Sequence, residues 1–265
     1  MSNFFLISLL VAGVYAYMAW FLYRSPSTRP AWLKFLLPAA LVAHGGLVYA
    51  SVLGQGAITL GFGNSLSTIA WLTACIYWLT SYRYPLARIQ SWVSALAAVA
   101  VLLPLFFTGA HAIPNSEALA LRAHLIVSLL AYGFLAIAAL HAVLMTTLEK
   151  KLHRASALSG GAPPLLTLEA VLFRTLTVGF VLLTLAVSSG VVFSEELFGK
   201  PLQFTHKIVF ALLSWLTFGA LLLGRRLRGW RGRTALYWTL TGFVFLLLSY
   251  VGTQFVLEVL LHRQG

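Results

Sequence analysis

Runs of about twenty apolar residues, separated by short polar segments, recur along the whole chain. A helix needs roughly 20 such residues to cross a hydrocarbon core about 30 Å thick. The pattern therefore predicts an all-α, polytopic integral membrane protein, a single transmembrane domain over residues 1–265. Residues 1–22 have neither a positively charged start nor an A-x-A cleavage site, so they are expected to form a span rather than a cleaved signal. The eight predicted spans are residues 4–22, 33–53, 65–81, 91–108, 122–147, 171–193, 206–224 and 235–258.

Basic residues fall mainly in alternate loops between these spans. Fourteen of the 18 lysines and arginines lie in the loops after the first, third, fifth and seventh spans or just beyond them, most densely in "GRRLRGWRGR" at 224–233. Cytoplasmic loops carry an excess of Lys and Arg, so both termini are predicted to face outward. The other side keeps only Arg122, Lys200, Lys207 and Arg263.

Composition excludes several classes of protein. The chain is 60% hydrophobic and 9% charged, which leaves too little polar surface for a soluble globular domain. Its net charge of +12 resides in short loops and indicates topology rather than nucleic-acid binding. Aspartate is absent and there are six glutamates, which disfavours a carboxylate-driven ion pump or a two-carboxylate hydrolase. The single cysteine, Cys75, excludes a disulfide framework or a thiolate metal cluster.

Histidine is the reactive side chain with the most informative placement. His124 begins the fifth span at the outer surface, and Ser128 and Tyr132 follow it at i+4 and i+8 on one helix face. His262 returns to the same side after the eighth span. Two neutral imidazoles from different helices suit the axial positions of a haem iron. The alternative is that histidines and aromatic residues are common at the lipid headgroup level.

A second pair of histidines lies deeper. His44 is near the middle of the second span, where polar groups are costly, and His141 is near the cytoplasmic end of the fifth. His141 is 17 positions from His124, roughly 25 Å along a helix, so these two cannot share a metal. His44 and His141 converge only if the second and fifth spans are neighbours. Otherwise His44 is expected to bond to a neighbouring carbonyl or hydroxyl.

Two segments carry a resemblance to a known family. "RAHLIVSLLAYGFLAIAAL" at 122–140 and "GFVFLLLSYVGTQFVLEVLLH" at 242–262 resemble the histidine-bearing spans of the cytochrome c assembly protein family. The resemblance covers roughly residues 40–263 and is closest to the HemX and YpjD-like branch. It implies a protein of the bacterial inner membrane that binds haem b and presents it at the outer face during cytochrome c assembly. The implied haem contacts are His124 and His262 as iron ligands, Phe198, Phe204 and Trp215 around the macrocycle, Lys207 at the propionates, and His206 and His44 as further candidates.

The same region departs from the family pattern. Where full cytochrome c synthetases carry a tryptophan-rich signature, this chain has "FGKPLQFTHKIVFALLSW", with Thr205 in place of an aspartate. Full haem ligase activity is therefore not expected. The implied partners are the lipid bilayer, haem, and an apocytochrome or another membrane protein, with no nucleic acid. The alternatives are a haem-free regulatory or transport component of a membrane complex, or a redox enzyme that passes electrons from quinol to haem.

Overall fold

A computed structural model describes most of the chain. The described residues are 2–26, 31–54, 57–84, 86–107, 109, 111–113, 116–153, 165–192 and 205–256, without the side chains of Ser2, His111, Leu165 and residues 150–153.

The described residues are almost entirely helical, which confirms the all-α fold class. Each predicted span coincides with a helix, and two strands of two residues each, β1 (Thr59–Leu60) and β2 (His111–Ala112), pair antiparallel between connecting segments. The helices are α1 (Ser2–Arg24), α2 (Leu33–Val52), α3 (Phe62–Ser81), α4 (Ala87–Ala100), α5 (Leu103–Phe106), α6 (Leu119–His153), α7 (Leu165–Val192), α9 (His206–Arg228), α10 (Gly232–Leu247) and the π-helix η1 (Leu248–Gly252).

Seven helical stretches within the described residues are long and apolar enough to cross a membrane. The chain is therefore a multi-pass membrane protein. Helix α3, which matches the predicted span 65–81, has 20 residues but is not among the seven. Its polar side chains Asn64, Ser67 and Thr68 are buried, so the polar face of this helix lies inside the bundle rather than against lipid.

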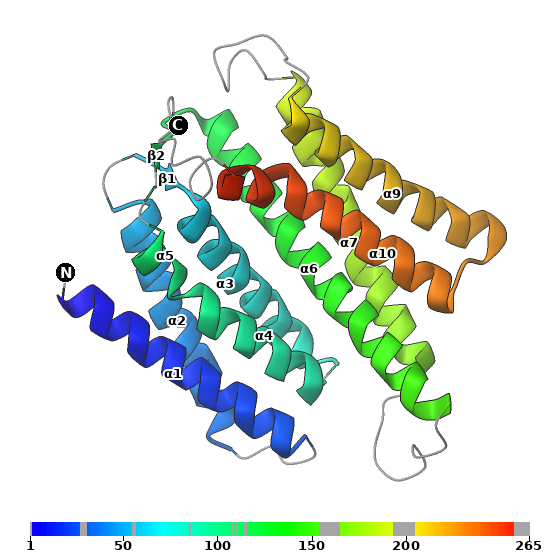
Figure 1. The fold of residues 1–265 in the computed structure, drawn as a ribbon, viewed down its shortest axis with the longest axis horizontal. Coiled ribbons are helices and arrows are strands. Elements are labelled where there is room, and N and C mark those ends of the chain that lie inside the picture. Colours follow the sequence, from blue (N-terminus) through cyan, green and yellow to red (C-terminus); the bar gives the residue numbers. More distant parts are fainter. Residues whose placement is uncertain are drawn as a thin grey trace.

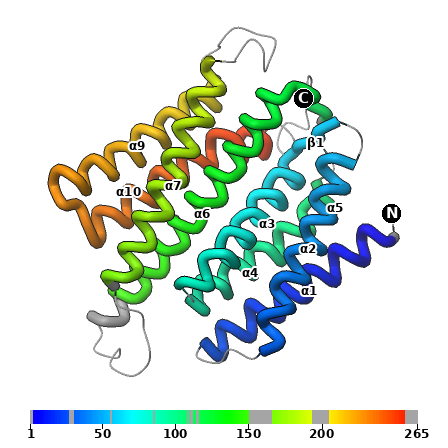
Figure 2. Tube along the Cα trace, turned by 180° about the vertical axis from the view of Figure 1, so that it is seen from behind, coloured from blue at the N-terminus to red at the C-terminus, as the bar shows by residue number. Residues whose placement is uncertain are grey.

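The helices form two groups that meet along one seam (Figures 1 and 2). Helices α1 to α4 pack together on one side, and α6, α7, α9 and α10 on the other. The seam is formed mainly by α3 and α6, with α4 adding contacts to α6. A close approach at Gly133 of α6 allows it, because a Cβ there would lie 2.8 Å from Cδ1 of Ile76 on α3.

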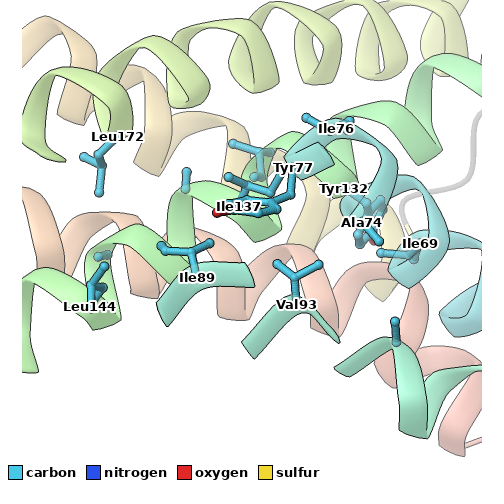
Figure 3. Close-up of a cluster of buried hydrophobic side chains, with 14 of the residues drawn as sticks. Ile69, Ala74, Ile76, Tyr77, Ile89, Val93, Tyr132, Ile137, Leu144 and Leu172 are labelled. Atoms are coloured by element: carbon cyan, nitrogen blue, oxygen red, sulfur yellow. The ribbon is translucent and has the colours of Figure 1, made fainter. Parts of the chain in front are cut away.

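The core of the molecule lies across this seam. Figure 3 shows buried apolar side chains from α3, α4, α6 and α7, including Ile76, Ile89, Ile137 and Leu172. Tyr77 joins them, and its hydroxyl donates to the carbonyl of Leu86, just before α4, at 2.6 Å. The seam is therefore a packed interior and not a channel between two bundles.

Successive long helices run in opposite directions, which gives the bundle two distinct ends (Figure 1). We call the end with β1 and β2 the strand end. Helix α1 begins and η1 ends there. We call the opposite end the basic end, because it carries the described arginines in and beside the α3–α4 and α9–α10 connections together with Arg24 and Arg174. The side of the membrane that each end faces remains a prediction.

Several helix boundaries differ from the predicted spans: α6 (Leu119–His153) and α7, which begins at Leu165, are longer than 122–147 and 171–193, and two other differences have a local cause. The span predicted at 91–108 breaks at Val101 and Leu102, and the short α5 begins there with Pro104 in its first turn. A proline fits the start of a helix because its missing N–H has no intrahelical partner at that position. Helix α9 runs to Arg228, beyond the predicted end at 224. It ends there because Gly229, with φ of 67°, adopts the left-handed conformation that glycine accommodates without strain.

Candidate functional site

His124 lies on α6 at the strand end, where α7 fixes the orientation of its ring. Its Nδ1 is 2.9 Å from the hydroxyl of Ser189. The same hydroxyl lies 3.1 Å from the Ala186 carbonyl, so it can donate to that carbonyl while it accepts from the imidazole. In that arrangement Nδ1 of His124 carries the proton and Nε2 does not. This is the arrangement of metal-binding histidines, whose second nitrogen is held by a hydrogen bond.

Gly190 of α7 lies beside this ring. A Cβ at that position would meet Cε1 of His124 at 3.4 Å, an ordinary van der Waals distance. Ser189 and Gly190 belong to the "SSG" sequence inside the apolar span predicted at 171–193. Sequence reasoning missed Ser189, and a serine pair followed by glycine within an apolar run was the available signal.

Two residues of the polar stripe predicted on α6, His124 and Tyr132, contact different helices. Tyr132, two turns below His124, donates its hydroxyl to the Leu246 carbonyl at 2.7 Å and lies 3.2 Å from the hydroxyl of Ser249. Both partners belong to α10 and η1. The stripe therefore joins α6 to α7 through His124 and to α10 through Tyr132.

Three of the predicted haem contacts, His262, Phe198 and Phe204, lie outside the described residues. The described chain ends at Val256, at the same end of the bundle as His124 and six residues before His262. The pairing of His124 with His262 remains a prediction.

Trp215 faces a different side of α7 from His124. Its indole donates to the Thr184 hydroxyl at 2.9 Å and stacks on Phe180, with 6.0 Å between ring centroids. Thr184 and Ser189 are five residues apart, which places them about 140° apart around α7. Trp215 therefore joins α9 to α7, and the structure does not bring it to the side of α7 that holds His124.

His206 and Lys207 begin α9 at the strand end. His206 is exposed and Lys207 is half-buried. Ser214, seven residues after Lys207, donates to the Gly242 carbonyl of α10 at 2.9 Å. Seven residues are close to two helical turns, so Lys207 lies on the side of α9 that faces α10. A cation is thus present at the same end of the bundle as His124.

His44 is fully buried between α1, α2 and α3. Its Nε2 lies 3.0 Å from the Ser67 hydroxyl, and the ring of Tyr15 packs edge-on at 5.7 Å. One nitrogen of His44 therefore bonds to a neighbouring hydroxyl, as expected from the sequence if His44 and His141 did not converge. Among the described residues, Nδ1 of His44 and the hydroxyl of Tyr15 are buried with no hydrogen-bond partner.

His141 belongs to a different part of the bundle. Its Nδ1 donates to the Ile137 carbonyl of its own helix at 2.8 Å. Helix α3 lies between α2 and α6, so the structure does not bring His141 and His44 together (Figure 2). Within the described residues, no group of three or more His, Cys, Asp or Glu side chains is placed to hold a metal ion.

A cluster of charges joins the helices of the second group at the basic end. The Glu169 carboxylate on α7 lies 3.3 Å from the Arg225 guanidinium and 3.8 Å from that of Arg231. Arg225 also lies over the ring of Phe173, at 3.4 Å from its centroid. At the basic end, Glu169 therefore joins α7 to α9 and to the α9–α10 connection.

Comparison with known proteins assigns the chain to a family. Residues 32–261 match the family described as "Cytochrome C assembly protein". The chain belongs to the cytochrome c assembly protein family. It is 27% identical over 224 residues to inner membrane protein YpjD of Escherichia coli strain K12, which covers 83% of this chain and 84% of that protein.

Shorter matches involve proteins named for cytochrome c biogenesis. The chain is 36% identical over 98 residues to the cytochrome c biogenesis protein CcsA of Synechococcus sp. strain CC9605, or 37% of this chain and 32% of that protein. The CcsA of Prochlorococcus marinus strain AS9601 is 39% identical over the same length, 37% of this chain and 31% of that protein. Family membership confirms the resemblance and supports a role in cytochrome c biogenesis. The multi-pass fold and the inner-membrane relative agree with the predicted localisation.

Proposed function

We propose that the protein binds haem b at the strand end of the bundle and presents it at the outer face during cytochrome c assembly, with His124 and His262 as axial ligands. The observation that carries the proposal is the Ser189 hydrogen bond. We take Nδ1 of His124 to be the donor in this bond, as in metal-binding histidines, so that Nε2 is the nitrogen that would bind iron. The family supports haem as the group that is handled.

Other side chains have separate tasks in this proposal. Lys207 supplies a cation at the strand end for a haem propionate. Phe198 and Phe204 supply aromatic surface for the macrocycle. Trp215 acts from a distance, because its bond to Thr184 fixes α9, the helix that carries Lys207. Two imidazoles on one iron leave no open position for oxygen, which suits holding and transfer of haem rather than turnover of a small substrate.

The proposed orientation of the bundle in the membrane follows from the distribution of its basic residues. The described arginines and lysines, apart from Arg122 and Lys207, lie at or towards the basic end. Because cytoplasmic loops carry the excess of basic residues, we assign the basic end to the cytoplasm and the strand end, with both termini, to the outside. The receiving partner is then an apocytochrome or another membrane protein on the outer side.

The test is a reduced-minus-oxidised absorption spectrum of the detergent-purified protein. The variants are His124→Ala, His262→Ala and, as a matched control at the other end of α6, His153→Ala. We expect a low-spin b-type spectrum in the unmodified protein and in the control, and its loss or conversion to high spin in the other two.

Two results would contradict the proposal in different ways. If the spectrum survives both changes, the ligand assignment is wrong, and His44 and His206 become the next candidates. If no haem is bound even when the cells are supplied with excess haem, a haem-free regulatory or transport component describes the protein better.

A further inference from the structure

The last described helix changes its winding near the strand end. Helix α10 ends at Leu247 and continues as the π-helix η1 from Leu248 to Gly252 (Figure 1). Single π turns inside α-helices are rare and occur frequently at functional sites. A π turn bonds i to i+5 rather than i to i+4, so it adds one residue and rotates the rest of the helix by about 100°. This turn therefore decides the direction in which the chain continues.

Side chains from two other helices hold the turn. The hydroxyl of Tyr132 on α6 donates to the carbonyl of Leu246, just before the turn, and contacts the Ser249 hydroxyl inside it. From α3, the Ser65 hydroxyl donates to the hydroxyl of Tyr250 at 3.2 Å. Tyr132, Ser249 and Ser65 are all buried, so these bonds form away from competing solvent.

Tyr132 and His124 share helix α6. They are eight residues apart, which is about 12 Å along the axis and about 80° around it. The helix that presents His124 therefore also holds the π turn, from which the chain continues through Val256 towards His262.

We propose that Tyr132 is a positioning residue, whose hydroxyl fixes the π turn and thereby the direction in which the chain runs from α10 towards His262. The proposal rests on the proposed function in one respect, namely that His262 is an iron ligand. The hold of Tyr132 on the turn does not depend on haem and is measured without it.

The first measurement uses haem-free protein with two nitroxide labels. Ile126 on α6 and Val256 after η1 are both exposed, so cysteines at these positions accept labels in a Cys75→Ser background. We expect Tyr132→Phe to shift or broaden the distance distribution measured by EPR. The matched control is Tyr77→Phe, which removes the hydroxyl of another buried tyrosine, bonded to the Leu86 carbonyl near the basic end, and should leave the distribution unchanged.

The second measurement uses the haem-loaded protein. Loss of one intramolecular hydrogen bond changes populations about 2- to 10-fold, so we expect Tyr132→Phe to raise the high-spin fraction by that factor. Tyr77→Phe should remain low-spin. If Tyr132→Phe does not fold, Ser249→Ala removes only the 3.2 Å contact and should give a smaller change in the same direction.

The outcomes separate the two hypotheses. An unchanged label distance in Tyr132→Phe overturns the hold on the turn. A changed distance with unchanged low-spin haem overturns the link to His262. Absence of haem from the unmodified protein overturns the proposed function, whereas the label distances still decide whether Tyr132 holds the turn.

Discussion

Gly179 of α7 marks a point where α7 and α6 come unusually close. A Cβ at this position would lie 2.8 Å from both Cγ and Cδ2 of Leu135 and 3.3 Å from its backbone nitrogen. Leu135 is fully buried, and its Cγ is a branch point rather than the end of a flexible chain. Carbon atoms prefer separations of about 3.5–4.0 Å, so Gly179→Ala must move α7 away from α6 or force Leu135 into another rotamer.

Two opposing effects determine how much Gly179→Ala changes the free energy of unfolding. Alanine is favoured over glycine inside a helix by roughly 0.5–1 kcal/mol. Inserting a methyl group into a packed interface costs about 1–3 kcal/mol. We therefore expect Gly179→Ala to lower the free energy of unfolding by about 0.5–2 kcal/mol. Gly46 of α2 is the matched control, because a Cβ there meets nothing within 4 Å. Only the helix preference acts in Gly46→Ala, which should stabilise the protein by roughly 0.5–1 kcal/mol.

The assay is equilibrium unfolding by SDS in mixed micelles, followed by circular dichroism. The two variants should move the midpoint in opposite directions from the unmodified protein. The reasoning is refuted if Gly179→Ala is as stable as the unmodified protein, or if both variants shift the midpoint the same way.

Three further changes test separate contacts. Tyr15→Phe removes a hydroxyl that is buried without a partner among the described residues, so stability should rise by about 1 kcal/mol, and a lower SDS midpoint would mean that the hydroxyl is satisfied after all. Glu169→Gln removes the carboxylate between Arg225 and Arg231 and should cost about 1 kcal/mol at low salt, less at high salt; equal midpoints at low salt would contradict the role of this ion pair. Ser189→Ala releases His124 and should weaken haem retention by roughly 10-fold, measured as the rate of haem transfer to apomyoglobin, and an unchanged rate would refute the tautomer argument.

The number, order and approximate limits of the helices were predictable from the sequence. Membrane spans depend on local composition, because every backbone group in the bilayer core must be satisfied within its own helix. Helix α3 carries polar side chains within a span. They are compatible with the membrane because the neighbouring helices bury them. The break at Val101 and the pairing of β1 with β2 depend on contacts between distant segments and were not predicted.

The candidate site was predictable only in part. The position of His124 at the strand end follows from counting residues along a span. Its partner Ser189 is 65 residues away, and the turn at Leu248 is held by Tyr132 and Ser65 from two other helices. Such partners depend on which helices pack against each other. Small residues such as Gly133 and Gly179 allow close packing, but the sequence does not show which helix will lie against them. The sequence also did not show whether His44 and His141 lie close together. They do not, because α3 lies between the helices that carry them.

The seam between the two groups of helices has a consequence for how the protein is made. Helices α1 to α4 find their partners largely among themselves, so this group can assemble in the bilayer while the ribosome still translates α6 and the residues beyond it. The hydrogen bonds that hold the π turn form last. Ser65 bonds to Tyr250, which is synthesised 185 residues later, and Tyr132 bonds to Leu246. A chain released early by a stalled ribosome would therefore insert most of its helices and still lack the hydroxyl bonds that hold the π turn. Incomplete translation products would remain in the membrane without a finished strand end.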